Sequence, residues 1–346
     1  MLIAVTLHAC GSSNQGGGES FEARLYVTSG ATDEVLQLDP RDGRITGSFS
    51  LERRRDEIDG PHGIVVAPDG RHWYATLSHG EPTLWKFERP GDRLVGRVGL
   101  GTKGAARIGV TPDGSRGFIP DYYRSGQGRP SAMAVVNLSD LSIVARPTLC
   151  PAPHDAQVQP SGELVAVACS MSDEVVVLDV ASLGQVDRFF VDTLPGPAGL
   201  PRFKPLNLVW SPDGATLYVA LHAAGEIRAF SIQGEPLGVA AVGPGPAQIA
   251  IADNGRTLVT ANRNDASVSI LRLPELQERA RIDIGRPHPH GVALGKGGKL
   301  AYVTYEGDVG SSGGVVAIDL ETMEPVWTAE AGAFTLGIVY VDSEGP

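Results

Sequence analysis

Short apolar segments alternate with glycine-ending turns along most of the chain. The turns are APDG (67–70), TPDG (111–114), QPSG (159–162), SPDG (211–214), ADNG (252–255) and GKGG (295–298). In Pro-Asp-Gly turns, proline presets φ at the corner and glycine takes the positive φ that closes it. An apolar run precedes each turn and another follows it. The pattern therefore predicts two paired antiparallel strands at every turn.

Each repeat continues with two further strands, as in EVVVLDV (174–180) followed by QVDRFFV (185–191). Four antiparallel strands in a repeat of this length are typical of one blade of a β-propeller. The chain begins with ARLYVT (23–28), which matches a second strand without a first. It ends with FTLGIVYVDSEGP (334–346), which matches a first strand and its turn. The two ends together complete a repeat.

This arithmetic predicts an all-β fold, a seven-bladed β-propeller that is closed by pairing of the C-terminal strand with the N-terminal blade. Six internal repeats and the hybrid repeat make seven blades. Closure is favoured because it removes the unpaired edges of the sheets. We expect the propeller to occupy residues 23–346 as one domain.

Composition agrees with many short strands, because the chain holds 44 glycines and 25 prolines. Hydrophobic residues make up 42% of it, which suffices for a large core. The net charge of −11 argues against a nucleic-acid partner, because phosphate contacts require clustered Lys and Arg.

The first 22 residues differ from the rest. MLIAVTLHAC (1–10) is apolar up to Cys10, and the Gly/Ser-rich GSSNQGGGES (11–20) follows it. Leu7 to Cys10 resembles the lipobox of bacterial lipoproteins, in which the cysteine is lipidated and becomes the mature N-terminus. We expect residues 1–9 to be the remnant of a signal peptide and residues 10–22 to be a lipidated cysteine with a flexible linker. The alternative is a disordered tail with a chance cysteine.

LYVT (25–28), LYVA (217–220) and AYVT (301–304), beside the Pro-Asp-Gly turns, resemble the YVTN-repeat family of seven-bladed propellers. That group is similar to the cytochrome-d1-type haem propeller of periplasmic nitrite reductases and to bacterial lactonase propellers. The chain has no Trp-Asp dipeptide and no Cys-x-x-Cys-His motif for covalent haem. The resemblance implies the fold, while the function has to come from the site.

Three histidines occupy one repeat position. His62, His154 and His290 each lie eight residues before a turn glycine and directly after a proline, at the start of the innermost strand. In a closed ring these positions surround the mouth of the central channel. Three converging imidazoles would bind a transition metal such as Cu, Zn or Fe. The alternative is that each imidazole bonds to a neighbouring loop without a metal.

The ends of the second strands reach the same face and carry further polar side chains. Long insertions in blade 3, between blades 4 and 5, and in blade 7 also open there, and loops on a rigid scaffold are where binding residues concentrate. The predicted ligand-binding face comprises His62, His79, His154, His222, His290, Asp121, Tyr122, Arg124, Asn262 and Tyr305.

Two cysteines also approach this face of the predicted propeller. Cys150 ends the last strand of blade 3, and Cys169 ends the second strand of blade 4. Two interpretations stay open, a disulfide in an oxidising compartment or a pair of buried free thiols.

Two classes of function follow. The first is a membrane-tethered, extracytoplasmic binding or scaffold module of the cell envelope, anchored by lipid at Cys10, which binds a protein or small molecule on its loop-rich face. The second is an enzyme that uses the histidine cluster for metal-dependent redox chemistry or for lactonase-like hydrolysis. The sequence has no nucleophile elbow and no phosphate-binding glycine loop, which favours the non-catalytic class.

Overall fold

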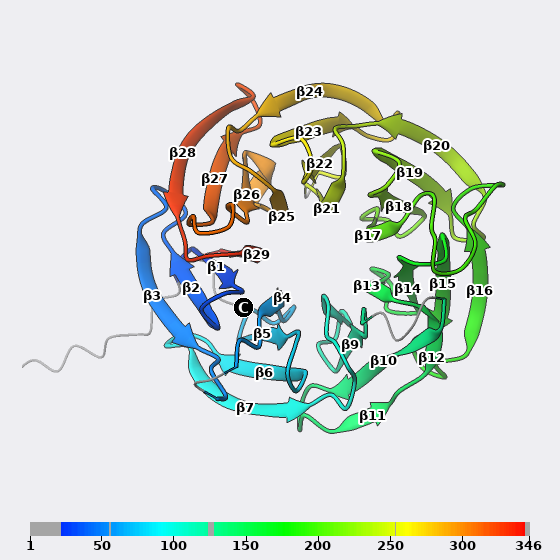
Figure 1. The fold of residues 1–346 in the computed structure, drawn as a ribbon, viewed down its shortest axis with the longest axis horizontal. Coiled ribbons are helices and arrows are strands. Elements are labelled where there is room, and N and C mark those ends of the chain that lie inside the picture. The colour runs from blue at the N-terminus through cyan, green and yellow to red at the C-terminus, as the bar shows by residue number, and fades with distance from the viewer. Residues whose placement is uncertain (1–21, 55–56, 124–127, 253, 343–346) are drawn as a thin grey trace, which may run out of the picture.

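Seven sheets surround a central channel in the computed structural model of the protein, as Figure 1 shows. The structure describes residues 22–54, 57–123, 128–252 and 254–342. Within these ranges the only helical element is a short 3-10 turn at Lys296–Gly298. The prediction of an all-β, seven-bladed propeller is confirmed. No helix among the described residues is long and apolar enough to cross a membrane.

Blade 1 closes the ring with strands from both ends of the chain, which lie side by side in Figure 1. From the axis outward it contains β29 (Thr335–Val341), β1 (Arg24–Ser29), β2 (Glu34–Leu38) and β3 (Ile45–Ser50). β29 and β1 are antiparallel, with Val341 opposite Arg24 and Val339 opposite Tyr26. The predicted closure is therefore present.

Blades 2, 4, 5, 6 and 7 are four-stranded sheets with the strands in sequence order. Blade 2 contains β4 (Pro61–Val66), β5 (His72–Leu77), β6 (Thr83–Glu88) and β7 (Arg93–Gly99). Blade 4 contains β13 (Pro153–Val158), β14 (Leu164–Cys169), β15 (Glu174–Asp179) and β16 (Gln185–Phe190). Blade 5 contains β17 (Pro205–Trp210), β18 (Thr216–Leu221), β19 (Glu226–Ser231) and β20 (Pro236–Ala241).

The remaining regular blades complete the ring. Blade 6 contains β21 (Pro246–Ile251), β22 (Thr257–Asn262), β23 (Ser267–Arg272) and β24 (Gln277–Asp283). Blade 7 contains β25 (Pro289–Leu294), β26 (Leu300–Tyr305), β27 (Gly314–Asp319) and β28 (Glu324–Glu330).

Blade 3 departs from four strands. It contains β8 (Gly109–Val110), β9 (Arg116–Pro120), β10 (Pro130–Asn137), β11 (Ile143–Ala145) and β12 (Thr148–Pro151). Both β11 and β12 pair with β10, which has a register shift in each pairing. The innermost strand β8 is only two residues long, and it does not begin at a proline, unlike the innermost strands of blades 2, 4, 5, 6 and 7.

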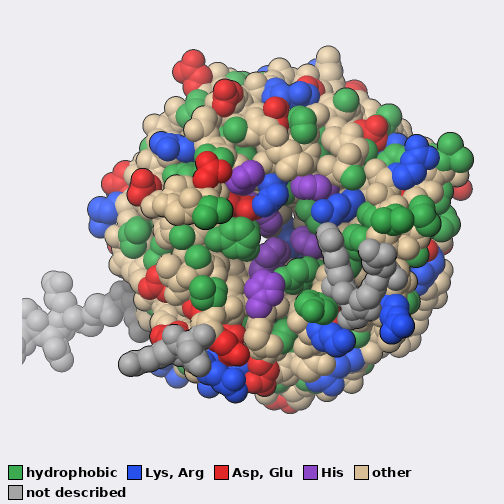
Figure 2. All heavy atoms as spheres, in the orientation of Figure 1, with side chains coloured by type: hydrophobic (Ala, Val, Ile, Leu, Met, Phe, Trp, Pro, Cys, Tyr) green, Lys and Arg blue, Asp and Glu red, His purple; other side chains and the backbone are tan. Residues whose placement is uncertain are grey.

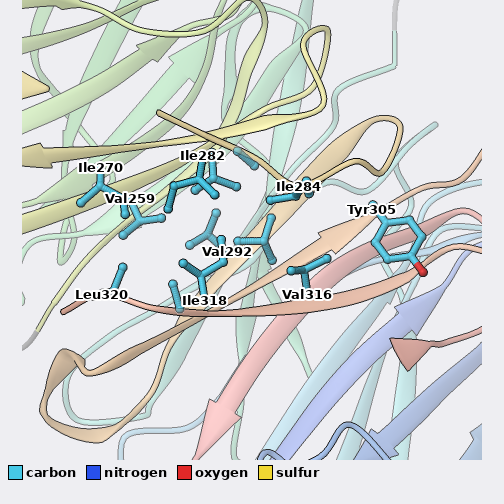
Figure 3. Packing of buried hydrophobic residues seen from close by; sticks show 13 residues of the cluster. Val259, Ile270, Ile282, Ile284, Val292, Tyr305, Val316, Ile318 and Leu320 are labelled. Atoms are coloured by element: carbon cyan, nitrogen blue, oxygen red, sulfur yellow. The ribbon is translucent and has the colours of Figure 1, made fainter. Parts of the chain in front are cut away.

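The core lies between the blades and not in one central mass. Each of seven clusters of buried apolar side chains joins two neighbouring blades. Figure 3 shows the cluster between blades 6 and 7, where Val259 and Ile270 face Val292 and Val316. The inner strands are buried on both faces, whereas the outermost strand of a blade exposes alternate residues, as β28 does.

Close approach of neighbouring inner strands defines the channel wall. A Cβ on Gly337 would lie 2.3 Å from the carbonyl oxygen of His62, and one on Gly291 would lie 2.3 Å from that of Leu336. The Thr28 hydroxyl accepts a hydrogen bond from Gly337 N at 2.7 Å. Glycine is required at these junctions because no side chain fits between the strands.

Candidate functional site

The candidate site lies where the innermost strands begin and the second strands end. Figure 2 shows the histidine side chains of this face gathered around the opening at its centre, with Lys and Arg side chains beside them.

The three histidines of the repeat meet at this mouth. The ring centroids of His62 and His154 are 5.7 Å apart, and those of His62 and His290 are 5.6 Å apart. Both pairs are edge to face, with interplanar angles of 83° and 84°. Histidines 228 residues apart in the sequence therefore form one cluster.

Local hydrogen bonds hold the segment that delivers His62. The buried Asp33 carboxylate accepts hydrogen bonds from the backbone N–H groups of Asp59 and Gly60, at 2.8 to 3.1 Å. β4 then starts at Pro61, whose ring fixes the backbone φ of the strand entry. Asp33 is a positioning residue that the sequence alone did not single out.

The ring nitrogens of the cluster are only partly satisfied. His154 Nδ1 bonds to the carbonyl of Leu206 at 2.9 Å, and His290 hydrogen-bonds to the backbone of Leu336. These bonds match the alternative in which imidazoles contact a neighbouring blade. Among the described residues, His62 Nδ1 and His290 Nδ1 are buried without a hydrogen-bond partner. An unpaired polar atom in such a place is costly, unless a ligand or water completes it.

Burial keeps the cluster neutral. It is the largest cause that lowers the pKa of His62 and His154 well below 6.5, and that lowers the pKa of His290 to about 3. Neighbouring positive charge acts in the same direction, and the Arg107 guanidinium contributes to all three shifts. At neutral pH the imidazoles are uncharged, each with one N–H donor and one lone pair.

Tyr122 lies across the cluster. Its ring is stacked on His62 with centroids 6.0 Å apart, and it meets His154 at 5.8 Å. The Tyr122 hydroxyl is 3.3 Å from Nε2 of His79. Tyr122 thus ties the loop of blade 3 to the end of β5 and covers part of the channel mouth.

Two adjoining cavities open at this face. One has a volume of about 400 Å³ and is lined by Ile58, His62, Ser78, His79, Tyr122, Arg263, His290, Glu306, Phe334 and Leu336, among others. The other has a volume of about 670 Å³ and extends over the 307–312 loop of blade 7. Both are bordered by Arg263, Glu306 and Phe334. Volumes of this size are typical of small-molecule sites.

An ion pair borders both cavities. Arg263 donates to both carboxylate oxygens of Glu306, at 2.6 and 2.7 Å, and Glu306 is buried. This bidentate geometry orients the guanidinium at the cavity wall. Arg263 and Glu306 follow β22 and β26, so their places were visible in the repeat, although they were not among the predicted site residues.

The predicted ligand-binding face is only partly assembled at the cavity. His62, His79, Tyr122 and His290 line it, and His154 adjoins it through its ring contacts. His222 bonds to the carbonyl of Pro246 at 3.3 Å. Arg124 lies outside the described residues, as does Cys10 with the predicted signal peptide remnant (1–9) and nearly all of the predicted linker (10–22).

Three predicted face residues are structural instead. Asn262 is fully buried and donates to the hydroxyls of Ser267 and Ser269. Tyr305 is 2% exposed and packs in the cluster between blades 6 and 7 (Figure 3). Asp121 is buried and accepts hydrogen bonds from the backbone N–H groups of Lys103 and Tyr123. Strand-end side chains alternate in direction, so a place at this end does not decide which ones reach the channel.

Cys150 and Cys169 form a disulfide in the structure. Both are fully buried, and the bond links β12 of blade 3 to β14 of blade 4. Of the two interpretations left open by the sequence, the molecule has the disulfide.

The predicted metal site, His62 with His154 and His290, has no complete ligand set here. In the ranges that the structure describes, no group of three or more His, Cys, Asp or Glu side chains is arranged to hold a metal ion. His154 Nδ1 is already bonded to a backbone carbonyl. Elemental analysis of protein purified without a histidine tag tests the metal: stoichiometric Cu, Zn or Fe that is lost on replacing all three histidines would support it.

Acidification is expected to destabilise the protein through the buried histidines of this face. The folded-state pKa of His290 is about 3 and that of His222 is about 4, below the 6.5 of an unperturbed histidine. The unfolded chain therefore binds more protons in this interval, so the free energy of unfolding begins to fall below about pH 6.5 and continues to fall until the pH approaches 3. Urea midpoints at pH 7, 5.5 and 4.5 measure the loss. His290→Gln should flatten the decline, and an unchanged slope would contradict the prediction.

No protein-family model matches the chain, and no curated protein matches its sequence. Solved structures share the fold. The periplasmic gluconolactonase of Pseudomonas aeruginosa is 17% identical, with a TM-score of 0.73 over 94% of this chain and 99% of that one. Hydrazine synthase of Kuenenia stuttgartiensis is also 17% identical, with a TM-score of 0.70 over 86% of this chain and 94% of that one. At such identity the likeness shows the fold alone.

Proposed function

We propose that this protein binds a small, hydroxyl-bearing molecule in the cavity at the mouth of its channel. The observation that carries the proposal is the pair of buried, unpartnered Nδ1 atoms of His62 and His290, two residues that line a cavity of about 400 Å³. Neutral imidazoles donate and accept hydrogen bonds, as sugar-like hydroxyl groups do. A bound ligand would satisfy atoms that the folded chain leaves unpaired.

The rest of the cavity suits the same kind of ligand. Tyr122 and Phe334 supply aromatic surface for the apolar face of a ring, and the Arg263–Glu306 pair supplies charged hydrogen-bonding groups. A few polar groups within a mostly apolar lining are the usual composition of small-molecule sites.

The proposal includes a location in the cell envelope. Lipidation at Cys10 would tether the propeller to the membrane on the extracytoplasmic side, with the cavity free to meet ligand or a protein partner. A fully buried disulfide supports an oxidising compartment, because stable disulfides are rare in the reducing cytosol. Labelling with a radioactive fatty acid in cells, lost in Cys10→Ser, tests the anchor.

Lactone hydrolysis is the second candidate function. The neutral imidazole of His62 favours it, as does the shared fold of the periplasmic gluconolactonase. His62 would take a proton from water as the water oxygen bonds to the ester carbonyl carbon, with Arg263 stabilising the oxyanion. The ring C–O bond then breaks, and the leaving alkoxide takes the proton from the imidazolium to give a hydroxy acid.

One experiment separates the two functions. Binding of D-glucitol and glucono-δ-lactone is measured by calorimetry, and lactone opening by pH-stat. His62→Leu is expected to weaken binding about tenfold, because it removes a hydrogen-bonding group in the cavity. His72→Leu, at the opposite end of β5, is the matched control. Binding without turnover supports the binding module, and equal binding by both variants overturns the site.

A further inference from the structure

Arg107 lies at the channel wall and has a guanidinium nitrogen without a hydrogen-bond partner in the described part of the chain. It lies in the segment before β8, where a Cβ on Gly63 would come within 2.9 Å of its Cα. Gly63 directly follows His62, so Arg107 is beside the histidine cluster. Its Nη1 atom is buried and has no hydrogen-bond partner among the described residues. Its side chain is 22% exposed, so part of it remains open to a ligand.

Asp155, the carboxylate that pairs with Arg107, is largely used by other groups. Arg107 Nε is 3.7 Å from Asp155 Oδ1, which is an ion-pair distance and not a hydrogen bond. The buried Asp155 accepts from the side chains of Asn207 and Gln157 and from Leu208 N. Asp155 therefore offsets part of the charge of Arg107 without occupying its outer N–H groups.

The imidazoles of the histidine cluster add further hydrogen-bonding atoms near Arg107. The positive charge of Arg107 contributes to the lowered pKa of His62, His154 and His290. Each of His62 and His290 keeps a buried Nδ1 atom without a partner. His290 uses its one N–H on the backbone of Leu336, so its Nδ1 atom is a hydrogen-bond acceptor. The Arg107 guanidinium and an N–H group of His62 are the donors available for an oxygen anion, and His290 Nδ1 can accept from a ligand hydroxyl.

We propose that Arg107, His62 and His290 form a subsite for an α-hydroxy carboxylate beside the cavity that the two histidines line. The proposal rests on the proposed small-molecule function and names the ligand class, a hydroxy acid. Its carboxylate would accept from Arg107 Nη1 and from His62 Nδ1–H, and its neighbouring hydroxyl would donate to His290 Nδ1. Its hydroxyl groups would then extend towards Tyr122 and the Arg263–Glu306 pair.

The charge balance selects a monoanion over a phosphate dianion. Arg263 is already paired with Glu306, and Arg107 has Asp155 nearby, so the site offers at most one uncompensated positive charge. The imidazoles are neutral at physiological pH. A second negative charge in this buried place would have no counter-ion, which is costly.

Calorimetric titration with three probes tests the subsite: D-gluconate, D-glucitol and inorganic phosphate. D-gluconate and D-glucitol share the polyol chain and differ in the carboxylate. We expect the wild type to prefer gluconate about tenfold, and Arg107→Gln to lose that preference while it still binds glucitol. Arg107→Lys, which keeps the charge but not the fork, should retain an intermediate preference. The melting temperature of each variant shows whether it folds.

The outcomes separate this proposal from the proposed function. Equal affinity of the wild type for gluconate and glucitol would overturn the carboxylate subsite and leave small-molecule binding in place. If folded Arg107→Gln still prefers gluconate, Arg107 does not bind the carboxylate and the proposed subsite is wrong. Tighter binding of phosphate than of gluconate would overturn the monoanion selection. Absence of binding for every probe, with the His72→Leu control behaving as the wild type, would count against both proposals.

Discussion

A chain that ends at Ala333 is expected not to fold. The deletion removes β29, which is the innermost strand of blade 1 and pairs with β1 along most of its length. It also removes the Leu336 carbonyl that Thr304 of blade 7 bonds at 2.7 Å. Blade 1 would then expose the edge of β1, and blades 7 and 2 would lose their shared neighbour. Unpaired edges and exposed apolar faces favour aggregation.

Circular dichroism, size-exclusion chromatography and thermal unfolding measure this loss. A chain ending at Asp342 is the matched control, because it keeps the whole of β29 and should behave as the full chain does. Gly337→Val makes the same point without a deletion. Its Cβ would lie 2.3 Å from the His62 carbonyl oxygen, so we expect a destabilisation of roughly 3 kcal/mol. A monomeric, cooperatively folded deletion variant would refute closure as the source of stability.

Loss of the disulfide is expected to have the next largest effect. Cys150 and Cys169 are 19 residues apart in sequence, and cross-links that close loops of this length stabilise proteins by about 3 kcal/mol. The bond joins blades 3 and 4, and both sulfur atoms lie in the apolar cluster between them. The double variant Cys150→Ala/Cys169→Ala should therefore unfold at a lower urea concentration than the wild type.

Reduction provides the control for this experiment. Dithiothreitol should lower the urea midpoint of the wild type towards that of the double alanine variant. The variant itself should not respond to the reductant, because Cys10 is not part of this bond. Equal midpoints for oxidised wild type and the variant would show that the disulfide does not stabilise the folded state.

The fold was predictable because its determinants are local and repeated. Positive φ at Gly70, Gly114 and Gly214 closes the turns that the sequence indicates. A proline is the first residue of the innermost strand in five blades, as Pro61 is in β4, and marks the strand entry. The closure of the ring was also predictable from the sequence, because one repeat is divided between the N-terminal strand and the C-terminal strand.

The candidate site was predictable only in part. The register put His62, His154 and His290 at one place, and the structure brings them together there. It did not reveal that Tyr305 points into the core, or that Arg107 joins the cluster from a segment without the Pro-His motif. Which nitrogen atoms remain unpaired also depends on neighbouring blades, since His154 is bonded by a residue 52 positions away.

By itself, the sequence determined the strands, the turns, the number of blades and the position where the chain ends meet. These depend on alternation, on turn chemistry and on a repeat length, all of which are properties of neighbouring residues. The tertiary structure decided which side chains share the channel, which of them are satisfied by backbone groups, and that Arg107 and two imidazoles keep free bonding capacity. Those outcomes depend on contacts between blades, and such contacts exist only after the ring has closed.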